Sequence, residues 1–140
     1  MFLLHRVAVG VFLVCCAPVY GEQPKFVWRY EIADTIYASP VVADIQGNGE
    51  AEILCAFRDR GEVVCLTTRG EVLWRHAAEG TVRLSPCVAD LTESPGLEVA
   101  MVDDRGVVYC LSGRGRLLWR RALPGVMGWG GIVAADLEGD

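Results

Sequence analysis

The sequence predicts an all-β fold built from a repeated four-stranded unit. The first observation is self-similarity: SPVVAD at 39–44 returns as SPCVAD at 85–90 and, without the Ser-Pro pair, as GIVAAD at 131–136, each time 46 residues later. The second observation is that short runs rich in Val, Leu and aromatic residues alternate with Gly- and Asp-containing turns, which is typical of strands and hairpins. Four antiparallel strands in a repeat of this length indicate one blade of a β-propeller.

Two further markers recur after 45 or 46 residues. DRGEVVCL at 59–66 matches DRGVVYCL at 104–111, and the Trp-Arg pairs begin at Trp28, Trp74 and Trp119. Because three independent markers agree, chance is a poor explanation of the repeat. The sequence therefore predicts a first blade at about 39–76, a second at about 85–121 and the start of a third from 131, all within a propeller region at 22–140.

Each unit is expected to contain four short strands. In the first blade these are residues 40–43, 53–57, 62–67 and 71–75, and the turns between the last three contain Gly61 and Gly70. A lone outer strand at 26–30 precedes the first blade, and an inner strand at 132–135 opens the third. No segment keeps a 3.6-residue apolar period with helix caps, so almost no helix is expected.

Residues 1–21 have the pattern of a secretory signal peptide. His5 and Arg6 precede an apolar run at 7–17, and small or apolar residues lead to a cleavage site before Glu22. The run is too short to span a bilayer comfortably. The prediction is a secreted or periplasmic protein with no membrane span in the mature chain. An alternative is lipoprotein anchoring at Cys16, although Cys15 stands where a smaller residue is expected.

The charge and cysteine content limit the function classes. The net charge of −5 gives no reason to expect nucleic-acid binding or attachment to anionic lipid. Four cysteines lie outside the leader, without a CxxC spacing that would indicate zinc. An exported protein can pair such cysteines, and buried free thiols fit equally well, so both readings stay open for Cys55, Cys65, Cys87 and Cys110.

The repeat resembles known bacterial propeller families. Residues 43–54, ADIQGNGEAEIL, resemble FG-GAP or VCBS repeats, and residues 70–74, GEVLW, resemble the tryptophan-docking motif of PQQ-like repeats. The resemblance implies an exported, non-catalytic binding or scaffold module for a protein or carbohydrate ligand. Its alternative is the N-terminal part of a PQQ-dependent quinoprotein dehydrogenase or another propeller enzyme. Because the PQQ-like motif is a packing motif, PQQ itself is not expected as a cofactor.

The FG-GAP resemblance also implies a calcium loop. Its ligands would be the side chains of Asp44, Gln46, Asn48 and Glu52, with Glu50 supplying a backbone carbonyl. Only two of these four side chains are charged, so calcium binding should be weak. The alternative is that the leading Asp accepts hydrogen bonds from turn amides. The third copy has a better-charged but incomplete loop, formed by Asp136, Glu138 and Asp140.

Large aromatic rings recur at one place in the outer strands. Trp28, Trp74 and Trp119 each follow the same point of the repeat, so we expect them to pack between neighbouring blades. They are predicted to be structural and to take no part in chemistry. The chain also lacks the sequence marks of a catalytic triad or a nucleotide loop, and no catalytic residue is assigned.

One position of the repeat carries a different side chain in each copy, although the strand motif that follows it is repeated. Two residues before Ser39 and before its equivalents at 85 and 131 stand Tyr37, Arg83 and Trp129. These side chains are expected at one rim of the central channel, where a propeller would contact its ligand. Two blades cannot close a ring of about four to eight. The sequence is therefore expected to be an N-terminal piece whose missing C-terminal blades complete the propeller.

Overall fold

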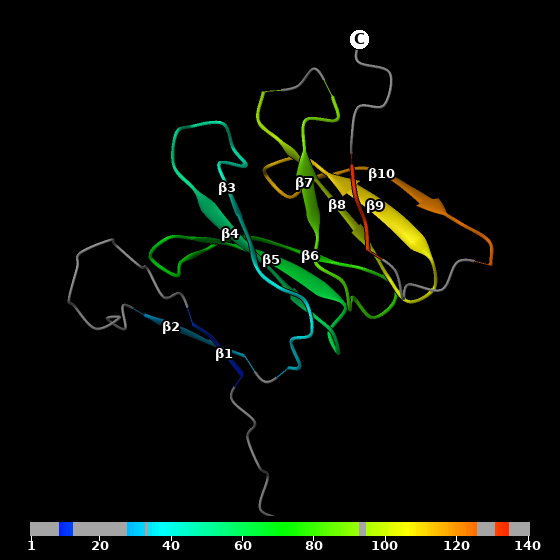
Figure 1. Ribbon diagram of the computed structural model, residues 1–140, viewed down its shortest axis with the longest axis horizontal. Coiled ribbons are helices and arrows are strands. Elements are labelled where there is room, and N and C mark those ends of the chain that lie inside the picture. The colour runs from blue at the N-terminus through cyan, green and yellow to red at the C-terminus, as the bar shows by residue number, and fades with distance from the viewer. Residues whose placement is uncertain (1–8, 13–27, 33, 93–94, 126–130, 135–140) are drawn as a thin grey trace, which may run out of the picture.

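The computed structural model describes residues 9–12, 28–32, 34–92, 95–125 and 131–134. All regular structure in these ranges is β-strand (Figure 1). This confirms the predicted all-β class. Within the same ranges no helix has the length and hydropathy needed to cross a bilayer. Outside them lie most of the predicted leader, the rim residue Trp129 and the incomplete loop formed by Asp136, Glu138 and Asp140.

Two antiparallel four-stranded sheets follow one another along the chain, as predicted. The first has the order β3-β4-β5-β6 and consists of β3 (Val41–Ala43), β4 (Glu52–Phe57), β5 (Glu62–Thr67) and β6 (Val72–Ala77). The second has its strands in the matching order and consists of β7 (Cys87–Ala89), β8 (Glu98–Val102), β9 (Val107–Leu111) and β10 (Leu117–Ala122). Each sheet is a meander of neighbours in sequence, which is the topology of a propeller blade.

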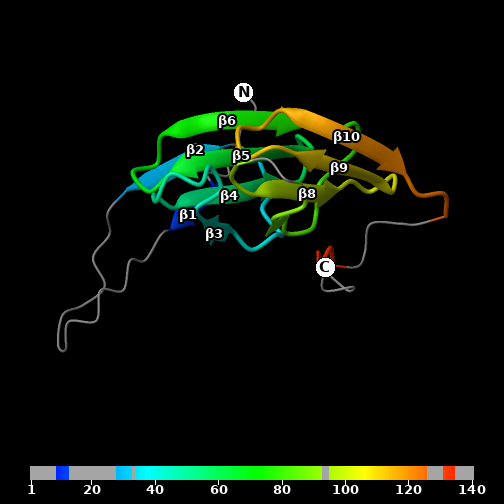
Figure 2. The same cartoon turned by 90° about the horizontal axis from the view of Figure 1, so that it is seen from above.

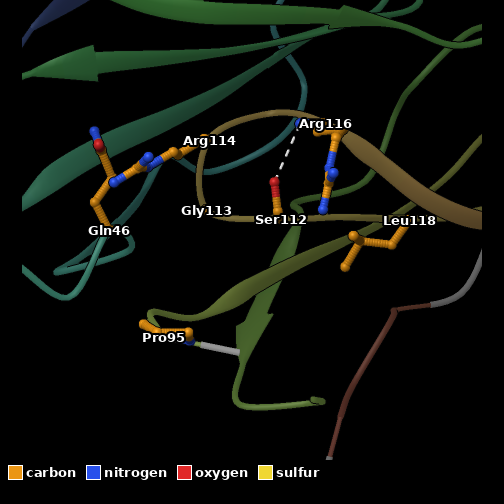
Figure 3. A pocket seen from close by; sticks show the side chains of 7 residues that line it. All are labelled: Gln46, Pro95, Ser112, Gly113, Arg114, Arg116 and Leu118. Atoms are coloured by element: carbon orange, nitrogen blue, oxygen red, sulfur yellow. Dashed lines mark hydrogen bonds between the residues drawn. The ribbon is translucent and has the colours of Figure 1, made fainter. Parts of the chain in front are cut away.

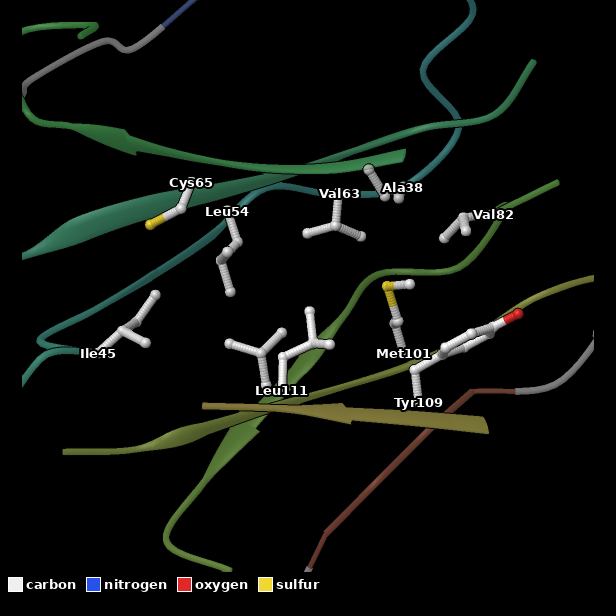
Figure 4. Packing of buried hydrophobic residues seen from close by; sticks show 11 residues of the cluster. Ala38, Ile45, Leu54, Val63, Cys65, Val82, Met101, Tyr109 and Leu111 are labelled. Atoms are coloured by element: carbon white, nitrogen blue, oxygen red, sulfur yellow. The ribbon is translucent and has the colours of Figure 1, made fainter. Parts of the chain in front are cut away.

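The hydrophobic core lies on the two central strands of each blade. Strands β4 and β5 are apolar on both faces, so alternate side chains enter different clusters. One cluster joins the facing surfaces of the two blades, with Leu54 and Val63 opposite Met101, Tyr109 and Leu111 (Figure 4). The other lies on the far face of blade 1. Its members are Ile32, Ile53, Cys55, Phe57, Val64 and Leu66, with Trp28, Tyr30 and Ile36 packed against them.

The N-terminal strands form a separate two-stranded sheet beside blade 1 (Figure 2). Strand β2 (Arg29–Ile32) begins three residues after the start predicted for the lone outer strand and pairs with β1 (Val9–Phe12). Strand β1 comes from the predicted leader, and removal of that leader stays a prediction. Its pairing covers one edge of β2, which satisfies backbone groups that a lone strand would leave open.

The inner strand predicted at 132–135 is not formed in residues 131–134, which have no regular secondary structure. A strand requires a partner for its backbone hydrogen bonds, and no described segment pairs with this one.

The four cysteines outside the leader are free thiols, and three of them are buried. Burial raises the pKa of Cys55 to about 11. Burial, together with the charge of Glu52 and the neighbouring Cys55, raises the pKa of Cys65 to about 12. The structure thus favours the reading of these residues as small buried hydrophobic groups over the disulfide alternative.

Candidate functional site

The repeated tryptophans connect one unit to a turn of the next. The Nε1–H of Trp28 donates to the Thr68 carbonyl at 2.7 Å, and that of Trp74 donates to the Gly113 carbonyl at 2.9 Å. Each ring lies against a glycine with positive φ, Gly70 at 84° or Gly115 at 76°. A Cβ atom would come within 2.7 Å of the first ring and 2.5 Å of the second. These turns need glycine both for conformation and for contact.

The third tryptophan differs from the other two. Trp119 lies on β10 with 48% of its surface exposed. The carbonyls of Thr68 and Gly113 accept hydrogen bonds from the indoles of Trp28 and Trp74, but no carbonyl of a described turn accepts one from Trp119. Its ring is therefore one of the large apolar groups on the outer strand of blade 2.

The predicted calcium loop is closed by side-chain oxygens that accept backbone N–H groups. Asp44 Oδ1 accepts from Asn48 N at 3.0 Å, and Asp44 Oδ2 accepts from Gly49 N at 2.9 Å. Glu52 is 3% exposed, and its Oε2 accepts from the backbone N of Ile45 at 2.8 Å. Both ends of the loop therefore use carboxylates to hold the turn. This bonding was the alternative reading of the leading Asp.

The second copy keeps both carboxylates, but only the inner one is buried. Glu98 is 1% exposed, and its two oxygens accept from Leu91 N at 2.8 Å and from the Thr92 hydroxyl at 2.7 Å. Asp90, the counterpart of Asp44, is exposed. The ninth loop position is thus a buried turn-closing carboxylate in both blades, a role that the metal-ligand interpretation had not given it.

The loop oxygens suit calcium in kind, since calcium prefers carboxylate, amide and carbonyl oxygens. Asp44 and Glu52 already accept amide hydrogens, and Gln46 and Asn48 are neutral, so the set would hold an ion only weakly. Across the described ranges, no group of three or more His, Cys, Asp or Glu side chains gathers where a metal could bind. Calcium binding at Asp44 stays a prediction.

Two of the three predicted rim residues lie on adjacent segments. The backbone N of Ser39 donates to Ser85 Oγ at 3.0 Å, which ties the approach to β3 to the approach to β7. Tyr37 is 68% exposed, with the Arg58 guanidinium 5.1 Å above its ring. Arg83 is half-buried, and its Nε donates to the Thr81 hydroxyl at 3.3 Å.

Two buried carboxylates beside these segments were not identified from the sequence. Asp34 accepts from the backbone N of Asp59 at 2.8 Å and from that of Arg60 at 3.0 Å. Asp103, with 0% exposure, accepts from the Gly80 backbone N and the Tyr109 hydroxyl at 3.1 and 3.0 Å. Each carboxylate joins the linker before a blade to the turn between that blade's second and third strands.

The two carboxylates come from opposite sides of the same junction. In the repeat, Asp34 corresponds to Gly80, and Arg58 corresponds to Asp103. Blade 1 supplies its acid from the linker, whereas blade 2 supplies it from the turn. A Cβ atom at Gly80 would collide with Asp104 Oδ1. The aligned repeats show both differences in the sequence. Only the structure shows that the two positions contact each other across the junction.

Two four-stranded antiparallel blades, packed face to face and linked by a recurring Trp–glycine turn contact, define part of a β-propeller. Solved structures share this fold. BamB from Moraxella catarrhalis is 20% identical with a TM-score of 0.56, and the match covers 71% of this chain and 28% of that one. The biofilm matrix protein Bap1 of V. cholerae is 19% identical with a TM-score of 0.54, covering 70% of this chain and 16% of that one.

The chain thus spans less than a third of either neighbour's length. At these identities the likeness shows the fold alone. No protein-family model matches the sequence, and no curated protein matches it.

Proposed function

We propose that this protein is an exported β-propeller module of the FG-GAP/VCBS or PQQ-like type that binds or scaffolds a partner without catalysis of its own. The observation that carries the proposal is the contrast between a repeated buried framework and differing exposed side chains. Glu52 and Glu98 close equivalent turns, whereas Tyr37 and Arg83 differ at equivalent exposed or half-exposed positions. Variable residues on a rigid scaffold are where binding specificity usually lies.

Export and the family type belong to this proposal. The leader pattern at 1–21 supports a secreted or periplasmic location, and the motifs at 43–54 and 70–74 support the repeat families. The fold alone does not favour the quinoprotein alternative, because propellers support many functions.

Partner contact at the rim can be tested by site-specific photo-crosslinking in the full-length protein. A benzophenone amino acid in place of Tyr37 or Arg83 is expected to give the same cross-linked protein or glycan band from intact cells. The control position is Glu71, which is exposed beside a turn at the opposite end of blade 1. If Tyr37 and Glu71 gave identical band patterns, or if neither rim position cross-linked, the rim would not be the binding surface.

Weak calcium binding at the Asp44 loop is a second, separate proposal, supported by its oxygen-only side chains and its tight glycine backbone. With calcium at about ten times a Kd on the order of 1 mM, the melting temperature is expected to rise by about 3–8 °C. Asp44→Asn should abolish the rise and Asp90→Asn should keep it. An equal melting temperature with calcium, magnesium or chelator would remove the metal proposal.

A further inference from the structure

A pocket of about 520 Å³ lies beside the turn between β9 and β10 (Figure 3). Its walls come from Gln46 between β3 and β4, Pro95 between β7 and β8, the β9–β10 turn and β10 itself. The lining residues are Gln46, Pro95, Ser112, Gly113, Arg114, Arg116 and Leu118. The pocket therefore bridges two blades at the end opposite the Tyr37 and Arg83 rim.

The polar side chains around this pocket can all donate hydrogen bonds, and two of them are cationic. Arg114 extends toward Gln46 in Figure 3, and Arg116 lies on the other side of the turn. Neither guanidinium forms an ion pair or hydrogen bond with another residue in the described part of the chain. Ser112 Oγ accepts from the Arg116 backbone N at 3.3 Å, which leaves its hydroxyl hydrogen available to a ligand. No carboxylate is among the described residues that line the pocket.

Blade 1 provides an internal comparison. A pocket of about 360 Å³ lies beside its equivalent turn and is lined by Glu50, Thr67, Thr68, Arg69 and Glu71. Arg69 corresponds to Arg114, but Glu71 corresponds to Arg116, so one charge is reversed between the copies. Among the described lining residues, the blade 1 pocket has one cation and two carboxylates, whereas the blade 2 pocket has two cations. The basic character is therefore specific to blade 2 and is not a property of the repeat.

We propose that the Arg114–Arg116 pocket binds the carboxylate side chains of an acidic peptide segment in a partner protein. Two guanidiniums with a hydroxyl and an amide form a donor set suited to carboxylates. This inference rests on the proposed function as a binding module and specifies the chemistry of a partner at a second surface.

The surroundings of the pocket favour a peptide over an acidic sugar. Leu118 belongs to β10, the outermost strand of its sheet, and no described strand pairs with the free edge of β10. An extended peptide can add to such an edge through main-chain hydrogen bonds, while its side chains enter the adjoining pocket. The apolar wall consists of Pro95 and Leu118, which suit aliphatic parts of a peptide. Among the described lining residues there is no aromatic ring on which a sugar ring could stack.

The test is fluorescence anisotropy of a labelled alternating Glu-Ala peptide with the full-length protein. The acidic peptide is expected to bind at least about tenfold more tightly than matched Gln-Ala or Lys-Ala peptides, with binding weakened by added salt. Arg116→Glu, which introduces the charge pattern of blade 1, should reduce its affinity by about tenfold or more. The matched control Arg69→Gln should leave the affinity unchanged, whereas Arg114→Gln should reduce it.

Each alternative outcome is distinguishable. Equal losses of peptide affinity in Arg69→Gln and Arg114→Gln would indicate diffuse charge attraction and would contradict a specific site at Arg114 and Arg116. Arg116-dependent binding of polygalacturonate without binding of the acidic peptide would overturn the peptide assignment. Unchanged circular dichroism and melting temperature would show that the exposed Arg116→Glu variant is folded. Loss of cross-linking at Tyr37 with retained peptide binding would reject the rim proposal while leaving this inference intact.

Discussion

Replacing Gly115 with Ala is expected to destabilise the protein far more than replacing Gly125 with Ala. Both glycines have nearly equal positive φ, 76° and 77°, so the backbone penalty of about 1–2 kcal/mol should be shared. A Cβ atom at 125 would meet no described atom within 4 Å, whereas one at 115 would lie 2.5 Å from Trp74 Cδ2. The resulting clash should add about 1–3 kcal/mol. Urea unfolding and near-ultraviolet circular dichroism would measure the difference.

A double mutant isolates the tryptophan contact. In a Trp74→Ala background, Gly115→Ala should cost no more than Gly125→Ala, because the ring that the new methyl group would meet is absent. Equal losses of unfolding free energy for the two glycine variants in the native background would show that the Trp74 contact does not constrain this turn.

Asp103→Ala is expected to lower the free energy of unfolding by at least about 3 kcal/mol, because four buried or half-buried donors would lose an acceptor. Asp103 accepts from the backbone N–H groups of Gly80, Arg105 and Val107 and from the Tyr109 hydroxyl. Burial, with help from Asp103, raises the pKa of Tyr109 to about 12. Chemical denaturation would measure the loss, with exposed Asp90→Ala as the control.

The buried carboxylate stands at different positions in the two blades, and this difference allows a second test. Gly80→Asp alone should destabilise, because its side chain would enter space occupied by Asp104 and Asp103. Combining it with Asp103→Arg recreates the Asp34 and Arg58 pattern of blade 1. The double variant should therefore be more stable than the sum of the single losses implies. The proposed role of the junction would be contradicted if the losses of unfolding free energy were strictly additive in the double variant. It would also be contradicted if Asp103→Ala lowered the free energy of unfolding as little as Asp90→Ala.

Most of the strand arrangement could be predicted because it depends on local pattern. The strand at 62–67 was predicted with the observed bounds, since turn residues mark both its ends. Strand β4 begins one residue earlier than predicted, at Glu52, because this charged residue turns inward and closes the preceding turn. The FG-GAP resemblance had placed Glu52 in the loop, as a calcium ligand. The sequence could not reveal that its carboxylate would be buried against amides.

Contacts between repeats were less predictable than the repeats themselves. Gly70 and Gly115 were recognisable as turn residues, but their close approach to Trp28 and Trp74 depends on how neighbouring units pack. Aligning the copies also could not show which residue lies across a junction. The pocket around Arg114 was missed for the same reason, because its walls come from turns that are far apart in the chain.

The position of blade 1 between two hydrophobic clusters has a consequence for local opening. Its central strands lose contacts on both faces when they separate, whereas in the described part blade 2 shares only the cluster between the blades. In a linear array, stability is a sum of each unit's own stability and its nearest-neighbour terms. The amides of β4 and β5 should therefore be the slowest to exchange with solvent, and opening should proceed inward from β10.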